Sequence, residues 1–188
     1  KAEQENGTCV YNGHSHDYAV PTTYEFKDAY GNNTVSYTGQ TERLNMFLEI
    51  KTYLATANTI GTQLDEQKLL DMFANQNGAF SGTGLNASSK QIENKVFALD
   101  VTIFKAYFDS IATHSTSTVA GSNGVAGVVS NGTKNYLCAA NGFDYAQLIE
   151  KGLMGALIYY QIAEVYTRDS KIGDAVDNTS AVHPENGE

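Results

Sequence analysis

Residues 144–168 constrain the fold most, because their apolar side chains are spread around a helix instead of lining one side of it. The pattern is set by Leu148, Ile149, Leu153, Ala156, Leu157, Tyr160, Ala163 and Val165. Asp144 and Gln147 are three residues apart, which is typical of a helix N-terminus. Gly152 and Gly155 each cost about 1 kcal/mol relative to alanine within a helix, so they predict close packing. The segment therefore predicts the central helix of a bundle.

Three further segments have the apolar spacing of helices and begin with capping residues. Thr41 is predicted to cap the first, Asp65 the second, and Ser88 with Gln91 to form the capping box of the third. β-Branched residues predict a local break in the third helix near Asp100. The apolar positions are Leu44, Phe47, Ile50 and Leu54, then Leu69, Leu70, Met72 and Phe73, then Phe97, Val101, Phe104, Phe108 and Ile111.

Two short segments near the N-terminus are predicted to form a β-hairpin. Val20 precedes Pro21 and is therefore extended, which predicts a strand over residues 20–26. Residues 34–38 alternate apolar and polar side chains and predict its partner strand. An isolated hairpin is marginally stable, so we expect it to pack on the helices as a strap. The predicted fold class is mainly α: a bundle of four to five helices with a small N-terminal β-hairpin or extended strap.

The chain is long enough for one domain with a substantial core. We expect a flexible leader over residues 1–16, a single helical domain over residues 17–168, and a polar tail over residues 169–188. Residues 113–134 are mostly Ser, Thr, Gly, Asn, Ala and Val, which predicts a mobile loop inside the domain.

The charge balance excludes several classes of partner. The formal net charge is −9 and no stretch is rich in Lys or Arg, which argues against nucleic acid and anionic lipid as partners. No window has the continuous apolar run of about 20 residues that a membrane span needs. Only 18% of residues are charged, and neutral polar residues take their place, which is typical of proteins outside the cytoplasm.

The clearest cluster of metal-ligand types is formed by His14, His16 and Asp17. Alternation along a strand places both imidazoles on one face, as some zinc sites require, and Asp17 adds an oxygen ligand. A closed zinc site needs three or four ligands, so the alternative is a solvated leader without metal. The sequence requires no cofactor, and iron, calcium and zinc are the candidate metals.

Aromatic and acidic residues on the last helix are candidate ligand-binding groups. Tyr159 and Tyr160, with Glu164 nearby, can stack a sugar or line a haem pocket. The alternative is that these tyrosines are core or interface residues with their hydroxyl groups at the edge.

Glu42, Glu49 and Glu164 can also bind iron or calcium as carboxylates that project between helices. The alternative is that Glu164 pairs with Arg43 or another cation, because a buried carboxylate needs a partner. The sequence has no E-x-x-H motif to complete such a carboxylate site.

The chain has two cysteines, Cys9 and Cys138. They form neither a metal motif nor a C-x-x-C redox motif. In an exported protein, such a pair predicts a disulfide that closes a loop of about 130 residues and contributes up to about 4–5 kcal/mol. The alternative is two free thiols.

Catalytic motifs are absent from the sequence. There is no G-x-S-x-G nucleophile motif, no H-E-x-x-H zinc motif and no phosphate-binding loop. The chain is therefore expected to be non-enzymatic.

Four motifs in order resemble one family: D-Y-A-V-P-T-T-Y-E-F, S-Y-T-G-Q-T-E-R-L-N-M-F-L-E-I, L-L-D-M-F-A-N and Y-A-Q-L-I-E-K-G-L-M-G-A-L-I-Y-Y-Q. They resemble the N-terminal half of an uncharacterised family, filed as a domain of unknown function, of exported lipoproteins from Bacteroidota. The resemblance implies that the polar tail leads into a second, C-terminal helical half. It also implies a location at the outer membrane or cell surface, with a lipid anchor outside this chain. At the level of architecture the family is similar to imelysin-like helical bundles linked to iron uptake, although their G-x-H-x-x-E signature is missing here.

The resemblance and the composition together predict a non-enzymatic, extracytoplasmic binding protein that serves nutrient or iron acquisition. One alternative is a structural accessory subunit of an outer-membrane complex, which predicts an exposed apolar or aromatic patch. Another is a metal-dependent hydrolase with its site in the second helical half. The expected partners are outer-membrane proteins or that C-terminal half.

Overall fold

The computed structural model divides the chain into two units, which are described separately. One unit comprises Lys1–Ser36 with Ala175–Glu188, and the other comprises Tyr37–Asp174. The residues that the structure describes are 8–11, 14–17, 26–28, 30–33 and 35–168.

The first unit contains a short antiparallel hairpin. Strand β1 (Thr8–Tyr11) pairs with strand β2 (His14–Asp17), with Cys9 opposite His16. This is not the hairpin predicted from the sequence, which covered residues 20–26 and 34–38. Most of the first predicted strand lies outside the described residues. The second predicted strand is wrong, because residues 35–37 are not in a strand and Thr38 already begins a helix.

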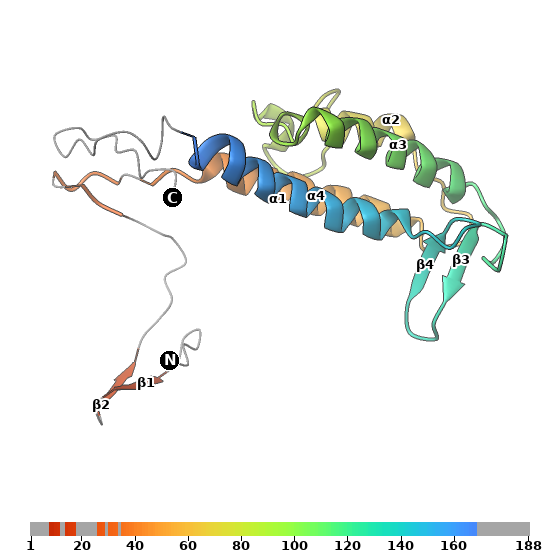
Figure 1. The fold of residues 1–188 in the computed structure, drawn as a ribbon, viewed down its shortest axis with the longest axis horizontal. Helices are drawn as coiled ribbons and strands as arrows, with labels where there is room; N and C mark the ends of the chain where they lie inside the picture. Colours follow the sequence, from red (N-terminus) through yellow and green to blue (C-terminus); the bar gives the residue numbers. More distant parts are fainter. Residues whose placement is uncertain (1–7, 12–13, 18–25, 29, 34, 169–188) are drawn as a thin grey trace. The chain divides into compact units, whose positions relative to one another are not determined.

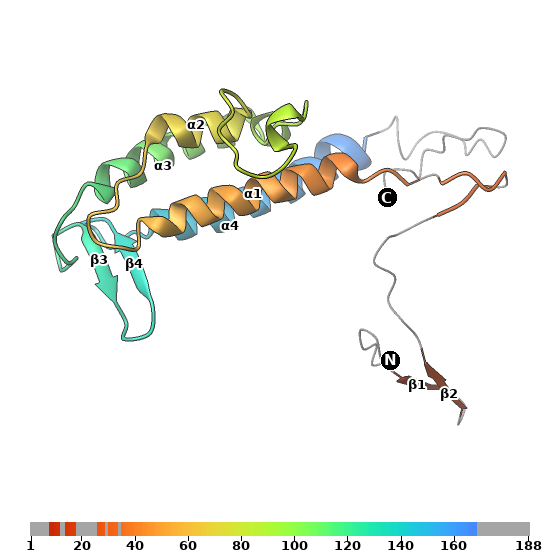
Figure 2. The same cartoon turned by 180° about the vertical axis from the view of Figure 1, so that it is seen from behind.

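The second unit is a two-layer bundle of four α-helices, which confirms the mainly α prediction. Helices α1 and α4 lie side by side in one layer, and α2 and α3 form the other (Figures 1 and 2). α1 and α4 are antiparallel: Gln40 near the start of α1 donates a hydrogen bond to the Tyr166 hydroxyl (2.9 Å), and Lys51 near its end pairs with Glu150 (3.1 Å). The helices are α1 (Thr38–Thr56), α2 (Glu66–Ala74), α3 (Ala98–Ser115) and α4 (Tyr145–Gln161), and a π-helical turn, η3 (Ile162–Tyr166), follows α4.

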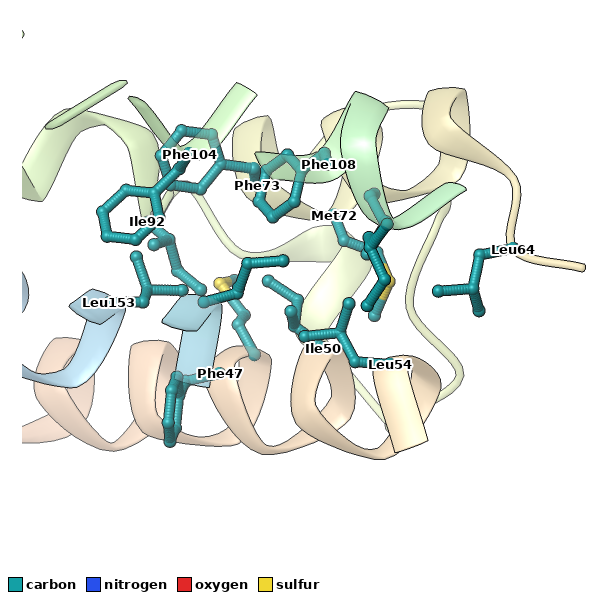
Figure 3. Close-up of a cluster of buried hydrophobic side chains, with 14 of the residues drawn as sticks. Phe47, Ile50, Leu54, Leu64, Met72, Phe73, Ile92, Phe104, Phe108 and Leu153 are labelled. Atoms are coloured by element: carbon teal, nitrogen blue, oxygen red, sulfur yellow. The ribbon is translucent and has the colours of Figure 1, made fainter. Parts of the chain in front are cut away.

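The core lies between the two helical layers. Phe73 of α2 packs edge-on against Phe108 and Phe104 of α3, with ring centroids 5.5 and 6.2 Å apart (Figure 3). From the other layer, Ile50 of α1 and Leu153 of α4 are buried against this cluster. The predicted apolar positions therefore form the core wherever they face the opposite layer.

Two of the predicted helix caps are confirmed. The Asp65 carboxylate accepts hydrogen bonds from the backbone N–H groups of Gln67 and Lys68, and Asp144 accepts one from Gln147 N–H (3.0 Å). The Thr41 cap is wrong: α1 begins at Thr38, about one turn earlier, and the Thr41 hydroxyl donates to the backbone carbonyl of Tyr37, the residue before the helix.

The predicted capping box at Ser88 and Gln91 is also wrong. The Ser88 hydroxyl donates to the Glu42 carboxylate on α1 (2.5 Å), and α3 begins ten residues later, at Ala98. The 3₁₀ turn η1 (Leu85–Ala87) comes just before Ser88, and a second one, η2 (Glu93–Lys95), lies between Ser88 and α3. The break expected near Asp100 does not occur, because α3 is continuous from Ala98 to Ser115.

Residues 113–134, expected to form a loop, include the last turn of α3 and a strand. Strand β3 (Gly127–Ser130) pairs antiparallel with β4 (Asn135–Cys138). The Asn131 side chain accepts hydrogen bonds from the backbone N–H groups of Thr133 and Lys134 and so closes the turn. The hairpin is attached to the turn that follows α1, because Asn58 in that turn accepts a hydrogen bond from Leu137 N–H (2.9 Å).

Helix α4 is covered on one side only within the described unit. Ile149 and Leu153 are its buried residues, whereas Met154 and Ile158 remain about half exposed. Gly152 does allow close packing, since a Cβ there would lie 3.3 Å from the Phe104 ring, but Gly155 faces open space. The prediction of a central, surrounded helix therefore holds for one face of α4.

Candidate functional site

The side of the α1–α4 layer that faces away from α2 and α3 carries a row of exposed apolar residues from each helix. Residues four apart lie on the same side of a helix. Each of these side chains is 45–56% exposed, although all are large and apolar. They are Leu44 and Leu48 of α1 and Met154, Ile158 and Ile162 of α4 and its π-helical turn. We call this surface the open face.

A groove of about 360 Å³ lies between α1 and α4 on this face, and Leu44, Met154 and Ile158 of the two rows line it. Phe47 lines it and points away from the Phe73 cluster, as Figure 3 shows. The other lining residues are Gln40, Arg43, Leu44, Lys95, Met154, Leu157, Ile158 and Gln161. The walls are therefore mainly apolar, and the charged groups that line the groove are both cations.

Arg43 and Lys95 lie together at one end of the groove. Arg43 is positioned by its hydrogen bonds to the backbone carbonyls of Gln91 (2.9 Å) and Gly39 (3.3 Å). The Lys95 ammonium lies over the Tyr160 ring, 5.5 Å from its centroid. None of the ion pairs within the described part of the chain involves Arg43 or Lys95.

The positive charge at this end is concentrated enough to shift the cations themselves. Burial lowers the pKa of Lys95, and the charges of Arg43, Lys90 and Arg168 lower it further. Burial also lowers the pKa of Arg43, partly offset by the neighbouring Glu42. An incoming negative group would therefore relieve repulsion among these cations.

The other end of the groove is bordered by an ion-pair network. Lys51, one turn beyond Phe47 on α1, and Lys151 share the Glu150 carboxylate, at 3.1 and 2.8 Å. A polar hollow of about 620 Å³ lies beyond, toward the β3–β4 hairpin. Three of its four charged groups, Lys51, Glu150 and Lys151, already pair with one another, and Lys134 is the fourth.

The predicted ligand-binding residues lie near the groove and do not line it. Tyr159 and Tyr160 both pack on Phe97, with centroids 5.4 and 5.2 Å apart. Glu164 pairs with Arg168, four residues on, and not with the Arg43 named above. Ligand binding by these three residues remains a prediction.

The predicted metal ligands His14, His16 and Asp17 make up part of β2, in the other unit. Among the residues that the structure describes, no group of three or more His, Cys, Asp or Glu residues is placed to hold a metal ion. Metal binding through β2 remains a prediction that the structure does not test.

Cys138, the second cysteine of the predicted disulfide, lies on β4 as a partly buried free thiol. Burial raises its pKa, and the charge of Asp144 raises it further, which favours the protonated thiol. Cys9 is in the other unit, so its pairing with Cys138 remains a prediction.

The two other candidate metal carboxylates have structural partners. The Glu42 carboxylate accepts a hydrogen bond from the Ser88 hydroxyl, as described above. Glu49 accepts hydrogen bonds from Ser81 N–H (2.8 Å), the Ser81 hydroxyl (2.9 Å) and Gly82 N–H (2.6 Å). Glu49 therefore attaches the 80–84 loop to α1.

We predict that Glu49 makes stability depend on pH. Burial alone raises the pKa of Glu49, but the hydrogen bonds from Ser81 and Gly82 and the charge of Lys68 together lower it. A lowered folded-state pKa adds stability above the unfolded value, and this is lost as pH falls through the folded value. Because the group is partly exposed, Glu49→Gln should cost about 1 kcal/mol at pH 7.

Urea unfolding at pH 7 and near pH 3 tests this prediction. The difference between wild type and Glu49→Gln should shrink at the lower pH, because protonation of the wild-type carboxylate removes the charge that the substitution removes. Asp109→Asn removes the same charge from an exposed position on α3 and serves as the control. Equal effects of the two substitutions at pH 7 would contradict a specific role for Glu49.

The fold and the groove define a class: a small helical-bundle domain with an exposed apolar contact face. In the described part of the chain, no helix has both the length and the apolar character needed to cross a membrane. The sequence profile of a domain of unknown function, DUF4856, matches residues 21–183. The chain therefore belongs to the DUF4856 family, which confirms the prediction of an uncharacterised family. No curated protein and no solved structure matches it.

The apolar residues of the groove were visible in the sequence, but their exposure was not. Leu44 and Leu157 were assigned to the core because they have helical spacing, and Leu44 is 55% exposed. Lys95 gave no signal, because only the path of the 88–97 segment brings it beside Arg43. The sequence signal that pointed to an exposed apolar surface was the excess of apolar residues around the last helix.

Proposed function

We propose that this chain is the helical domain of a non-enzymatic binding protein of the cell envelope, and that it works by contact through the α1–α4 groove. The envelope location is supported by the low content of charged residues and by the resemblance to exported Bacteroidota lipoproteins, which are anchored by a lipid outside this chain. A role in nutrient or iron acquisition is supported only by the analogy to imelysin-like bundles.

The observation that carries the proposal is the exposure of the five apolar side chains of the open face. Covering the exposed half of each would contribute about 1 kcal/mol per side chain. Contiguous exposed apolar surface of this kind is typical of binding sites. Arg43 and Lys95 beside the groove add the few polar groups that orient a ligand.

The same surface also supports a second function, a structural accessory subunit of an outer-membrane complex. That function predicts an apolar patch that is exposed in the isolated chain, and the open face is such a patch. The two proposals differ in the expected lifetime of the complex that the open face forms. A binding protein releases its ligand, whereas a structural subunit is purified with its partner.

A fluorescent amphipathic anion, 8-anilinonaphthalene-1-sulfonate, tests whether the groove binds ligands. We expect saturable binding to the wild-type chain, with one principal site. Ile158→Glu places a charge in the groove and should weaken that binding about ten-fold, equivalent to about 1.4 kcal/mol. Glutamate is a good helix former, so α4 should remain folded, which circular dichroism checks.

Leu99→Glu is the matched control. Leu99 is 71% exposed on α3 and does not line the groove. Its replacement should leave dye binding within about two-fold of wild type, which is below 0.5 kcal/mol. Equal binding by wild type and Ile158→Glu would overturn the proposed function.

A further inference from the structure

We infer that the groove receives an acidic amphipathic helix of a partner protein, which lies along α1 and α4. The inference rests on the proposed function and specifies the ligand of the same site. It follows from two independent properties of the open face: the arrangement of its apolar rows and the sign of the charges beside them.

The apolar rows have the geometry that a helix requires. Met154, Ile158 and Ile162 follow one another at intervals of four residues and span about 12 Å, or two helical turns. Leu44 and Phe47, which line the groove, form the opposite wall on the antiparallel α1. A third helix would place residues at i, i+3 or i+4, and i+7 between these rows, as in other helix-in-groove complexes.

The backbone of the groove also favours a helix over an extended peptide. α1 and α4 use their backbone N–H and C=O groups within the helices, so their walls present no edge to which a strand could add. A helix satisfies its own backbone groups and needs only apolar contacts. The groove is open along one side, so an acyl chain lying in it would remain partly in contact with water.

The charges beside the groove favour an acidic partner. Arg43 and Lys95 at one end and Lys51 and Lys151 at the other give four positive charges, against the two negative charges of Glu150 and of Glu42 beside Arg43. This local excess contrasts with a net charge of −9 for the whole chain. Oppositely charged surfaces increase the association rate and select the partner.

The same charges disfavour a second copy of this chain as the occupant. A two-fold contact would place each open face against itself, because both subunits use the same patch. The four cations of one copy would then meet the four cations of the other across an apolar contact. Like charges brought together in this way oppose association.

Two synthetic helical peptides test the inference. Both have leucine at i, i+4, i+7 and i+11 within about 18 residues, a length at which isolated helices become stable. One carries glutamate at the flanking positions and the other carries lysine, and both bear the same dye. By fluorescence anisotropy in about 50 mM salt, the acidic peptide should bind about ten-fold more tightly, and added salt should reduce the difference.

A charge reversal in the groove should change this preference. Lys95→Glu should weaken binding of the acidic peptide about five-fold, equivalent to about 1 kcal/mol, and strengthen binding of the basic peptide. Lys68→Glu makes the same change in net charge at an exposed position on α2, in the other helical layer. As the control it should change neither affinity by more than about two-fold.

The possible results separate this inference from the proposed function. Equal affinity for the two peptides would overturn the inference that the partner is acidic. If neither peptide binds while the dye still does, the inference that the partner is a helix would be overturned. In either case the groove itself would still be a binding site. Self-association that Ile158→Glu abolishes would show that a second copy is the occupant and overturn the inference. Absence of dye binding would overturn the proposed function.

Discussion

Phe108→Ala is expected to lower the free energy of unfolding by about 3–5 kcal/mol, the usual cost of removing a buried phenylalanine. Phe108 is fully buried, and its ring packs edge-on against Phe73 at 5.5 Å and 76°. Alanine would leave a cavity between α2 and α3 and remove an aromatic contact that joins them. Since small domains are stable by only about 5–15 kcal/mol, this one substitution would remove much of the total.

Urea unfolding followed by circular dichroism measures the effect. Leu99→Ala, on the same helix but 71% exposed, is the control and should change stability by less than about 0.5 kcal/mol. If Phe108→Ala does not fold, Phe108→Leu keeps most of the volume and should lose about 1–2 kcal/mol. Similar effects at Phe108 and Leu99 would contradict the described core.

Asn75→Asp is expected to cost about 3 kcal/mol at pH 7, although it exchanges one amide for a carboxylate of the same size. The Asn75 side-chain nitrogen donates to the carbonyl oxygens of Leu85 (3.1 Å), Ser88 (2.9 Å) and Lys90 (2.9 Å). An aspartate would present oxygens to these carbonyl oxygens, so the side-chain N–H donors would be lost. The carbonyl oxygens would also repel the negative charge of the carboxylate. The left-handed backbone at this position, with φ of 48°, accepts aspartate as well as asparagine.

The pH dependence of Asn75→Asp distinguishes lost donors from general damage. The carbonyl oxygens should raise the pKa of the new carboxyl group, so the variant loses stability as pH rises and regains part of it near pH 4. Asn131→Asp is the control, because Asn131 uses its side-chain oxygen as an acceptor, which aspartate retains. A loss for Asn75→Asp that does not change with pH would contradict this explanation.

The 85–97 segment connects these stability predictions to the groove. Asn75, which caps the C-terminus of α2, donates hydrogen bonds to three of its carbonyl groups, and Glu42 of α1 accepts one from Ser88. The segment continues to Lys95, one of the two cations that line the groove. The hydrogen bonds of Asn75 therefore stabilise the same segment that carries the Lys95 charge to the groove.

Local sequence chemistry determined several parts of this protein. Asp65 and Asp144 were identified as caps because each bonds to backbone N–H groups two or three residues away, an interaction that needs no tertiary contact. The helical spacing of Phe73, Phe104 and Phe108 likewise predicted core positions. The mainly α fold could be inferred from these signals alone.

The tertiary structure decided where local signals compete with distant partners. Ser88 has the sequence of a helix cap, but its hydroxyl donates to Glu42, 46 residues away, and α3 begins only at Ala98. Strand β3 carries a weak local signal and forms because β4 pairs with it and Asn58 holds Leu137 of β4. In each case the decisive hydrogen bond joins residues that the sequence separates.

The candidate site belongs almost wholly to this second category. The sequence shows that residues 144–168 are apolar around the helix, but α2 and α3 cover only one side of the α1–α4 layer, which leaves Met154 and Ile158 exposed. The charges beside the groove also come from separate segments, because folding brings Lys95 next to Arg43 of α1. Helix formation depends on nearby residues, whereas a groove depends on which faces other elements leave uncovered.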